Sequence, residues 1–392
     1  MRPGASLAIS TVMDGDSFTL ELAPSIADIP AAEWDPIAGT SNPFVSHAFL
    51  SALEESGSVS ADTGWAPYHV IIETEDGGLR GCVPMYLKSH SQGEYVFDQS
   101  WAHAYERAGG SYYPKLQISV PFSPVTGPRL LAQDAETKDL LLSACVQFAD
   151  QLNISSLNIT FPTYEEWQQM GDAGLLLRKD QQFIWSNDNY DNFDQFLDAL
   201  SSRKRKNIRK ERRQAVENGV EIEWVTGSDL QEHHWDAFYE FYLDTSNRKW
   251  GRPYLNRRFF SLLGEQMADK VLLIMCKREG HYIAGAINLI GSDALFGRNW
   301  GCIEHHPCLH FEACYYQAID FAIHHGLDRV EAGAQGQHKL ARGYMPQLTY
   351  SAHWIADAGF RRAVADFLKE EGAYVDSDKR ILSEMGPFRK SD

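Results

Sequence analysis

The order of the predicted helices and strands in the second half of this chain is the feature that most restricts its fold. Hydrophobic periodicity predicts two helices, three strands in direct succession, a helix, two strands and a closing helix, at residues 228–248, 256–267, 271–276, 282–290, 293–301, 312–325, 329–333, 348–355 and 360–371. A doubly wound nucleotide-binding fold would alternate strand and helix throughout. The predicted order excludes that fold and indicates a mixed α+β unit built on an antiparallel meander.

The first half of the chain repeats this order in looser form. Its predicted elements are strands, a polar proline-rich loop, a helix and a last strand, at residues 79–87, 94–98, 112–129, 135–152 and 156–161. Trp101 and Trp300 fall at similar points of the two halves. Because 392 residues exceed one ordinary core, we predict two domains of the same α+β type, residues 1–190 and 191–392.

A basic segment lies near the start of the second predicted domain. Phe193, Phe196, Leu197 and Leu200 have the i, i+3, i+4, i+7 spacing of an amphipathic helix, which we expect over residues 193–217. Residues 203–213 hold eight cations and one anion, although the net charge of the chain is −17. An acidic body argues against a general nucleic-acid binder, whereas the local cations predict an anion site.

We expect Arg203, Arg205 and Arg209 to contact the anionic partner. Three partners fit these cations: the backbone of an aminoacyl-tRNA, a nucleotide-linked donor, or the acidic body of this same protein. The alternative is a solvated helix face without a partner.

Several longer segments resemble one known family. They are residues 112–115, 120–129, 201–213, 297–302, 310–316 and 331–339. Together they resemble the FemAB-like group of predicted N-acyltransferases, whose members carry two GNAT (acetyltransferase-type) domains in tandem, and the match covers most of residues 30–375. The resemblance implies an α+β fold of tandem GNAT-like domains. It also implies acyl transfer to an amine of a small molecule or of a peptidoglycan-type peptide, with acyl-CoA or aminoacyl-tRNA as the donor.

Amide formation requires a base that removes a proton from the amine, and groups that stabilise the oxyanion. Candidate bases in the second domain are the glutamates and histidines of its polar loops: Glu304, Glu312, Glu331, His310 and His338. A buried carboxylate has a raised pKa, which suits such a base. The alternative readings are that Glu312 caps a helix and that Glu331 pairs with Arg298 or Lys339.

The turn after the strand at residues 329–333 is rich in glycine, which lets a ligand approach the backbone. Lys339 and Arg342 suit a carboxylate or phosphate. The candidate binding residues are Arg298, Trp300, Tyr316, Gln335, Gly336, Lys339, Arg342 and Tyr344, together with Lys115 from the first half. Residues 302–311 lack the Arg/Gln-x-x-Gly-x-Gly/Ala pattern that cradles the phosphates of coenzyme A.

Cysteine usage and hydropathy limit the remaining classes. The six cysteines form no CxxC pair, so we expect no metal site and reduced thiols. No signal peptide and no apolar run of about 20 residues is apparent, so we expect a cytoplasmic protein without a membrane span. The sequence therefore predicts an N-acyltransferase; the alternative is a non-catalytic module that binds a peptide or tRNA.

Overall fold

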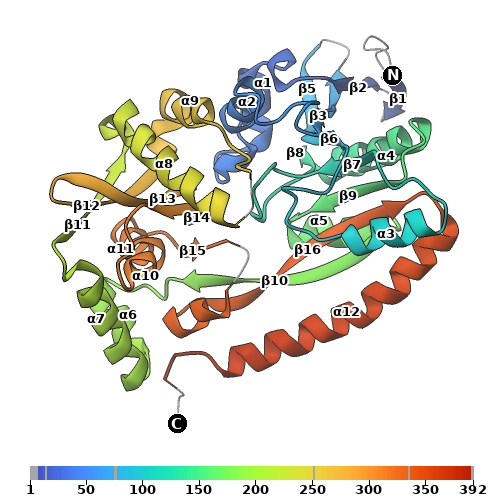
Figure 1. Cartoon of the computed structure of the whole chain (residues 1–392). Coiled ribbons are helices and arrows are strands. Elements are labelled where there is room, and N and C mark those ends of the chain that lie inside the picture. Colours follow the sequence, from blue (N-terminus) through green and yellow to red (C-terminus); the bar gives the residue numbers. More distant parts are fainter. Residues whose placement is uncertain (1–7, 14–15, 75–76, 250–251, 334–335, 390–392) are drawn as a thin grey trace. The chain divides into compact units, whose positions relative to one another are not determined.

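The computed structural model describes residues 8–13, 16–74, 77–249, 252–333 and 336–389, which form two compact units (Figure 1). Unit 1 comprises Met1–Asp180 and Thr349–Val375, and unit 2 comprises Gln181–Leu348 and Asp376–Asp392. Both units combine helices with mostly antiparallel strands, so the α+β prediction is confirmed. The division predicted at residue 190 assigns residues 349–375 to the second domain, whereas the structure groups them with unit 1.

Unit 2 contains a sheet with the strand order β11-β12-β13-β14-β15-β10. These strands are β10 (Leu176–Ser186, which begins in unit 1), β11 (Val220–Thr226), β12 (Val271–Arg278), β13 (His281–Ile290), β14 (Ala294–Cys302) and β15 (Arg329–Glu331). Neighbouring strands are antiparallel except β14 and β15, which are parallel. The expected meander is therefore present as β12, β13 and β14.

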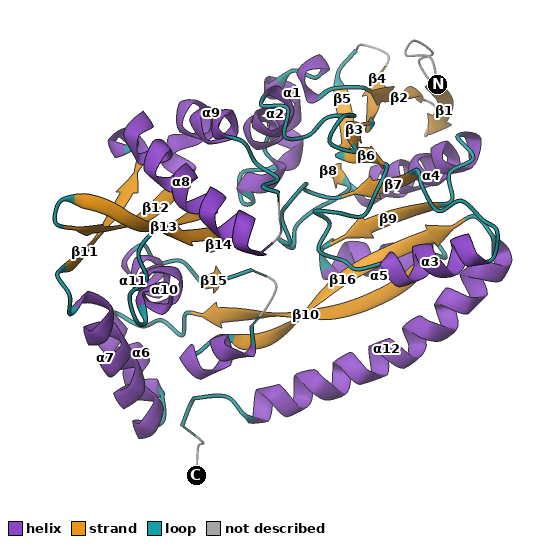
Figure 2. Ribbon diagram, in the orientation of Figure 1, coloured by secondary structure: helices purple, strands orange, loops and turns teal. Residues whose placement is uncertain are grey.

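Helices of unit 2 lie on both faces of this sheet (Figure 2). They are α6 (Phe193–Ala199), α7 (Ser202–Val216), α8 (Glu232–Lys249), α9 (Arg257–Met267), α10 (Leu309–Phe311), a π-helical segment η5 (Glu312–Tyr316), α11 (Gln317–His324) and a 3-10 segment η6 (Gln337–Arg342). Helices α8 and α9 pack on β12, β13 and β14, while α11 packs on β14 and β15. Leu272, Ile274 and Cys276 of β12 belong to one hydrophobic cluster with the buried side chains of α11, because alternate residues of a strand point to the same face of the sheet.

Unit 1 contains two groups of strands. The first has the order β1-β2-β4-β5-β8, made by β1 (Ala8–Met13), β2 (Asp16–Ala23), β4 (His69–Thr74), β5 (Leu79–Val83) and β8 (Leu131–Ala132). The second has the order β16-β9-β7-β6-β3, made by β3 (Trp65–Pro67), β6 (Met85–Lys88), β7 (Lys115–Ile118), β9 (Ser156–Thr160) and β16 (Met345–Ile355, which begins in unit 2). Its helices are α1 (Ala31–Ala38), α2 (His47–Glu55), α3 (Gln99–Arg107), α4 (Ala135–Gln151), α5 (Tyr164–Asp172) and most of α12 (Ala358–Glu384).

Several predicted elements differ from the structure. The strand expected at residues 79–87 is divided into β5 and β6, and the loop expected at 112–129 contains β7. The strand expected at residues 94–98 is an irregular loop that leads into α3, because Glu94 and Asp98 turn inward to a buried lysine. The helix expected at 193–217 is broken into α6 and α7 at Leu200, which adopts an extended conformation and forms a β-bridge with Phe388. The closing helix expected at 360–371 continues to Glu384.

The described helices include none that is both long and apolar enough to cross a membrane.

Helix α8 approaches β14 so closely that only glycine fits at residue 301. A Cβ there would lie 2.1 Å from the carbonyl oxygen of Phe241. Because backbone atoms cannot move aside cheaply, we expect Gly301→Ala to lower the free energy of unfolding by about 1–3 kcal/mol. Urea denaturation measures this. Gly372→Ala on α12 is the matched control, since nothing lies within 4 Å of the added Cβ; equal stabilities of the two variants would contradict the close contact.

Candidate active site

Most of the predicted site residues lie in unit 2, on the elements that follow β13. Arg298 and Trp300 are on β14, His310 is on α10, Glu312 and Tyr316 are on η5, Glu331 is on β15, and Lys339 and Arg342 are on η6. Gln335 lies outside the described residues. Lys115 belongs to β7 of unit 1.

Strand β14 carries an irregularity and then extends beyond its parallel neighbour. Against β13, Asn288 pairs with Gly297 but Ala286 pairs with Trp300, so the register shifts at Arg298 and Asn299. The pairing of β14 with β15 extends only from Ala294 to Phe296, whereas β14 continues to Cys302. Bulges of this kind re-aim side chains and occur next to active sites. The two predicted binding residues of β14 lie in this irregular half.

Aromatic rings gather next to Trp300. The ring of His310 lies 5.5 Å from that of Trp300, 5.6 Å from Phe311 and 5.4 Å from Tyr315, measured between centroids. Tyr315 belongs to η5, and single π-helical turns inside α-helices often mark functional sites. The cluster thus connects β14 to the helix that follows it.

His338 and Tyr315 form a hydrogen-bonded pair at this cluster. The Tyr315 hydroxyl lies 2.9 Å from His338 Nε2. Partial burial and the charges of Arg342 and Lys339 lower the pKa of His338 below its usual 6.5, so the imidazole is neutral at pH 7. Gly336 makes room for it, because a Cβ at that position would lie 2.4 Å from the ring. His338 is exposed, which leaves a neutral, accessible proton acceptor.

Arg342 is anchored beside this pair by a glutamate of α7. Its guanidinium contacts both carboxylate oxygens of Glu211 at 3.0 and 2.9 Å, donates to the carbonyl oxygen of His338, and lies 3.5 Å from the centre of the Phe311 ring. The Tyr316 hydroxyl donates to the same Glu211 carboxylate at 2.5 Å. Glu211 is the single anion of the basic segment, and it holds α7 to η6.

Glu312 forms an ion pair with Arg212, which follows Glu211 on α7. Arg212 contacts both its oxygens at 2.9–3.1 Å and also reaches Asp320 at 2.7 Å, while Gln317 donates at 2.7 Å. Burial raises the pKa of Glu312 although Arg212 opposes this. Neither the helix cap nor the free base considered from sequence describes this residue, because its carboxylate is buried in an ion pair.

Glu331 and Lys339 fix the turn that follows β15. Glu331 is buried and pairs with Arg329 at 3.0 Å; burial raises its pKa, and Arg329 opposes the rise. The Lys339 ammonium donates to the carbonyl oxygens of Ala332 and Gly333 at 2.6 and 2.8 Å. Burial lowers the pKa of Lys339 to about 8. Glu331 thus forms its ion pair with Arg329, and the charge of Arg298, one of the two suggested partners, also lowers its pKa.

Two predicted residues have environments that differ from a ligand site. Glu304 pairs with Arg278 and His306, and the hydrogen bonds from Arg278 lower its pKa to about 2, a poor match to a base at neutral pH. Tyr344 is fully buried in the core of unit 2, where its hydroxyl is 3.4 Å from the carbonyl oxygen of Tyr315.

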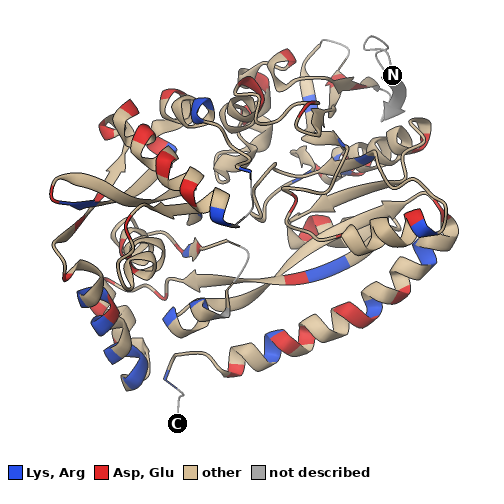
Figure 3. Ribbon diagram, viewed as in Figure 1, with Lys and Arg blue, Asp and Glu red and all other residues tan. Residues whose placement is uncertain are grey.

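Helix α7 carries its cations on two sides. Arg205 pairs with Asp198 and Arg209 with Asp194, both through single ion pairs. Arg203, Lys206, Lys210 and Arg213 follow at i, i+3, i+7 and i+10, which places them on one exposed face. These four are named here the α7 basic face, and Figure 3 shows the concentration of Lys and Arg on this helix. The ion pairs to carboxylates found for the cations of α7 among the described residues involve Arg205, Arg209 and Arg212 instead.

Sequence reasoning did not single out Glu211, Arg212, Tyr315 or Phe311. The lone anion within the basic run was the signal available for Glu211. No local pattern indicates that Tyr315 meets His338, since a helix and a loop separate them. The described residues contain no group of three His, Cys, Asp or Glu side chains suited to a metal ion.

Comparisons with known proteins give a family and a fold. The FemAB-like family, described as peptidoglycan biosynthesis/recognition, matches residues 25–390. No curated protein sequence matches the chain.

Among solved structures, FemX is similar with a TM-score of 0.54 and 12% identity, over 86% of this chain and 98% of that one. L-PGS from Bacillus licheniformis has a TM-score of 0.51 and 12% identity, over 85% and 98%. The C-terminal domain of a protein named as a lysylphosphatidylglycerol synthetase from Agrobacterium fabrum has a TM-score of 0.54 and 11% identity, over 90% and 97%.

At these identities the structural likeness concerns the fold, and the predicted class of tandem GNAT-like α+β domains is confirmed. The family match extends over nearly the whole chain, so the family expected from the sequence is confirmed as well. This chain belongs to the FemAB-like family of peptidoglycan biosynthesis/recognition.

Proposed function

We propose that the chain is an N-acyltransferase that moves an aminoacyl or acyl group onto an amine of a small molecule or a peptidoglycan-type peptide. The observation that carries the proposal is the neutral, exposed His338, hydrogen-bonded to Tyr315 beside the irregular half of β14. The family and the names of the similar structures support transfer of this class.

His338 is the base that this arrangement favours among the five candidates. As the amine nitrogen attacks the acyl carbonyl carbon, it must lose a proton. The Tyr315 oxygen can accept that proton while its own passes to His338 Nε2, 2.9 Å away. Burial raises the pKa of Tyr315 well above 10, so Tyr315 stays protonated and acts only as a relay.

The irregular half of β14 is the part of the unit 2 sheet that we assign to the donor. Its strand continues past the last pair with β15, and backbone N–H groups at such a site can stabilise a developing oxyanion. Arg298 and Trp300 project from this stretch. The C–S or C–O bond of the donor then breaks. From acyl-CoA the leaving group departs as a thiolate, and from aminoacyl-tRNA it departs as a ribose hydroxyl whose proton comes from the protonated His338.

The α7 basic face favours an anionic donor as large as tRNA. The affinity for tRNA should fall as the salt concentration rises, because each cation that contacts a phosphate releases counterions. The quadruple variant Arg203→Gln/Lys206→Gln/Lys210→Gln/Arg213→Gln removes all four cations. It should make the plot of log affinity against log salt concentration less steep by about 3. Filter binding of aminoacyl-tRNA between 50 and 200 mM salt measures this. The matched control changes four cations outside α7, Lys270, Arg362, Lys369 and Arg380, to glutamine. An equal change in both variants would mean that only net charge matters.

The α7 basic face also favours the alternative function, a non-catalytic module that binds tRNA. The test incubates the full chain with acyl-CoA or aminoacyl-tRNA and a panel of amines, and follows the mass of each amine. Binding of tRNA with no mass gain in any amine would support the module and overturn the transferase.

A further inference from the structure

One face of the second strand group in unit 1 is polar although it is buried. On β7 and β9, Leu116, Ile118, Leu157 and Ile159 point to the hydrophobic core. The alternate residues form the opposite face, named here the polar sheet face: Lys88, Lys115, Gln117, Ser156, Asn158, Thr160, Ser351 and His353. Every one of them is at most 3% exposed. A buried sheet face normally carries apolar side chains, so this composition requires another reason.

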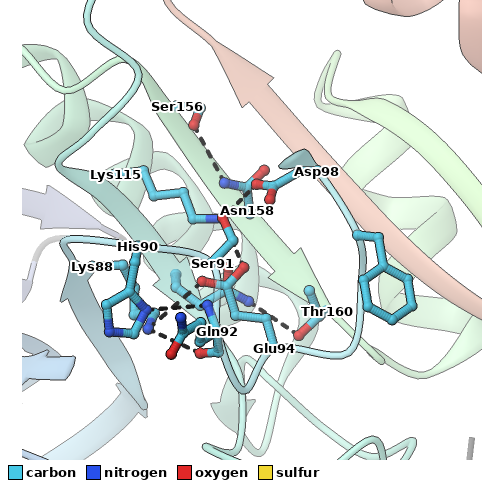
Figure 4. Close-up of polar contacts among 12 residues, drawn as sticks. Lys88, His90, Ser91, Gln92, Glu94, Asp98, Lys115, Ser156, Asn158 and Thr160 are labelled. Atoms are coloured by element: carbon cyan, nitrogen blue, oxygen red, sulfur yellow. Dashed lines mark hydrogen bonds and ion pairs between the residues drawn. The ribbon is translucent and has the colours of Figure 1, made fainter. Parts of the chain in front are cut away.

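A loop closes over this face and brings two carboxylates to it (Figure 4). The loop, residues 89–98, connects β6 to α3. The Lys115 ammonium donates to Ser91 at 2.8 Å, Glu94 at 2.7 Å and Asp98 at 2.5 Å, so all its protons are used. Lys115 therefore fixes the position of both carboxylates.

Each carboxylate keeps a second oxygen without a hydrogen bond, although Glu94 Oε1 lies 3.8 Å from the Lys88 ammonium. Glu94 Oε1, Asp98 Oδ1 and Gln117 Oε1 are buried and have no hydrogen-bond partner among the described residues. Glu94 and Asp98 are 4% and 2% exposed, and Gln117 is fully buried. An unsatisfied buried acceptor costs about 1–3 kcal/mol, and apolar side chains would stabilise the fold at least as well as this ion-pair set. Three such oxygens beside one polar face point to a ligand that donates hydrogen bonds.

The net charge of Lys88, Glu94, Asp98 and Lys115 indicates which kind of ligand fits. Asp98 and Lys115 both stay ionised, so their opposite charges cancel. Lys88 has one long bond, 3.3 Å to the carbonyl oxygen of Gln92, and lies 3.6 Å over the Trp65 ring and 3.8 Å from Glu94. Burial lowers the pKa of Lys88 to about 7 and raises that of Glu94 to about 7. Above pH 7 Lys88 is therefore neutral and Glu94 is ionised. The four side chains together then carry one negative charge, which one cation would balance.

We propose that the polar sheet face, together with Glu94 and Asp98, is a binding site for a primary ammonium group, as carried by an amino acid amide or a peptide N-terminus. It has three N–H donors, as many as the oxygens of Glu94, Asp98 and Gln117 that lack a hydrogen bond. The site consists of unit 1 residues alone and does not depend on the acyl transfer proposed above. The loop of residues 89–98 must open to admit the ligand, because it covers the face.

The pH dependence follows from the groups around the site. His353 stays neutral because burial lowers its pKa to about 3, and burial likewise lowers the pKa of His90. Tyr112 and Tyr113 stay protonated because burial raises their pKa values. For Asp98, the charge of Lys115 outweighs burial and lowers the pKa, while for Lys115 the two carboxylates outweigh burial and raise it. Only Lys88 and Glu94 titrate near pH 7. The ammonium therefore competes with up to two protons, and affinity should fall by about ten- to a hundredfold per pH unit below 7.

Calorimetric titration of the full chain tests the site, with alaninamide as the probe and N-acetylalaninamide as the probe without an ammonium. An α-amino group has a pKa of about 8, so about half of the alaninamide is an ammonium ion at pH 8. We expect alaninamide alone to bind at pH 8, and to bind more weakly at pH 6 although its amine is then fully protonated. Glu94→Gln should lower the affinity at least tenfold, while Glu136→Gln on the exposed start of α4 should not change it.

Three results would each overturn the proposal: no heat from alaninamide at pH 8, equal binding of both probes, or a Glu94→Gln variant that binds like the native chain. A crystal grown with alaninamide that holds only water at these oxygens would overturn it too. If Glu94→Gln fails to fold, the comparison of the two probes on the native chain still decides the question. Loss of transfer activity does not enter this test.

Discussion

Replacing His338 by glutamine is expected to lower the rate of acyl transfer by about 10²–10⁴-fold, the range for loss of a general base. Glutamine retains a hydrogen-bonding side chain but cannot take up a proton at neutral pH. The unliganded fold should be preserved, because His338 is exposed and the one side-chain hydrogen bond described for it is to Tyr315. Single-turnover mass spectrometry of the amine product measures the rate.

His305→Gln is the matched control, since His305 is an exposed histidine of the same unit. Tyr315→Phe should also slow the reaction, because it removes the relay. The native rate should rise with pH through the pKa of His338, which lies below 6.5, and then level off. A His338→Gln variant that retains the native rate and pH profile would exclude this residue as the base.

Lys115→Met is expected to cause the largest loss of stability, about 3–5 kcal/mol. The ammonium is fully buried and holds Glu94 and Asp98; without it, two carboxylates remain in a site closed to water. Asp98 should respond most, because Lys115 keeps its pKa low against the effect of burial. Stability that depends on a lowered carboxylate pKa is present above the unfolded pKa and is lost as the pH falls. The folded-state pKa of Asp98 lies below 3.8, so chemical denaturation at pH 7 and pH 3 should show a smaller difference between the variant and native chains at pH 3.

Lys277→Met provides the comparison for this prediction. Lys277 pairs with Glu223 at 2.7 Å, but both side chains are about one-third exposed, and pairs of that kind contribute at most about 1 kcal/mol. If both lysine variants lose the same stability, burial is not what makes Lys115 important.

Periodicity predicted the regular parts of the fold well, for a simple reason. Strands β12, β13 and β14 and helices α4 and α9 each bury a continuous or amphipathic apolar face, so the local pattern and the tertiary environment agree. The loop at residues 94–98 defeated the method. Its alternation resembles a strand, but Glu94 and Asp98 are the buried positions, and each accepts one hydrogen bond from Lys115 of β7.

The sequence indicated which residues gather at the candidate site, but not which of them contact one another. The polar loops of unit 2 were identified, and His338, Lys339 and Arg342 do lie close together there. The ion pairs of the glutamates depend on partners far away in the sequence. Glu312 pairs with Arg212, and Glu211 pairs with Arg342. These pairs join α7 to later elements, and no spacing within one segment encodes them. The prediction of Glu304 as a base failed to anticipate Arg278 on the preceding hairpin for the same reason.

The most direct test of the transferase proposal is a mass measurement on intact substrates. The full chain is incubated with aminoacyl-tRNA or acyl-CoA and a panel of amines and short peptidoglycan-type peptides. The proposal predicts that at least one amine gains the mass of the acyl group, and that His338→Gln suppresses the gain while His305→Gln does not. Absence of any acylated amine with both donors, from a chain that is folded by circular dichroism, would contradict it.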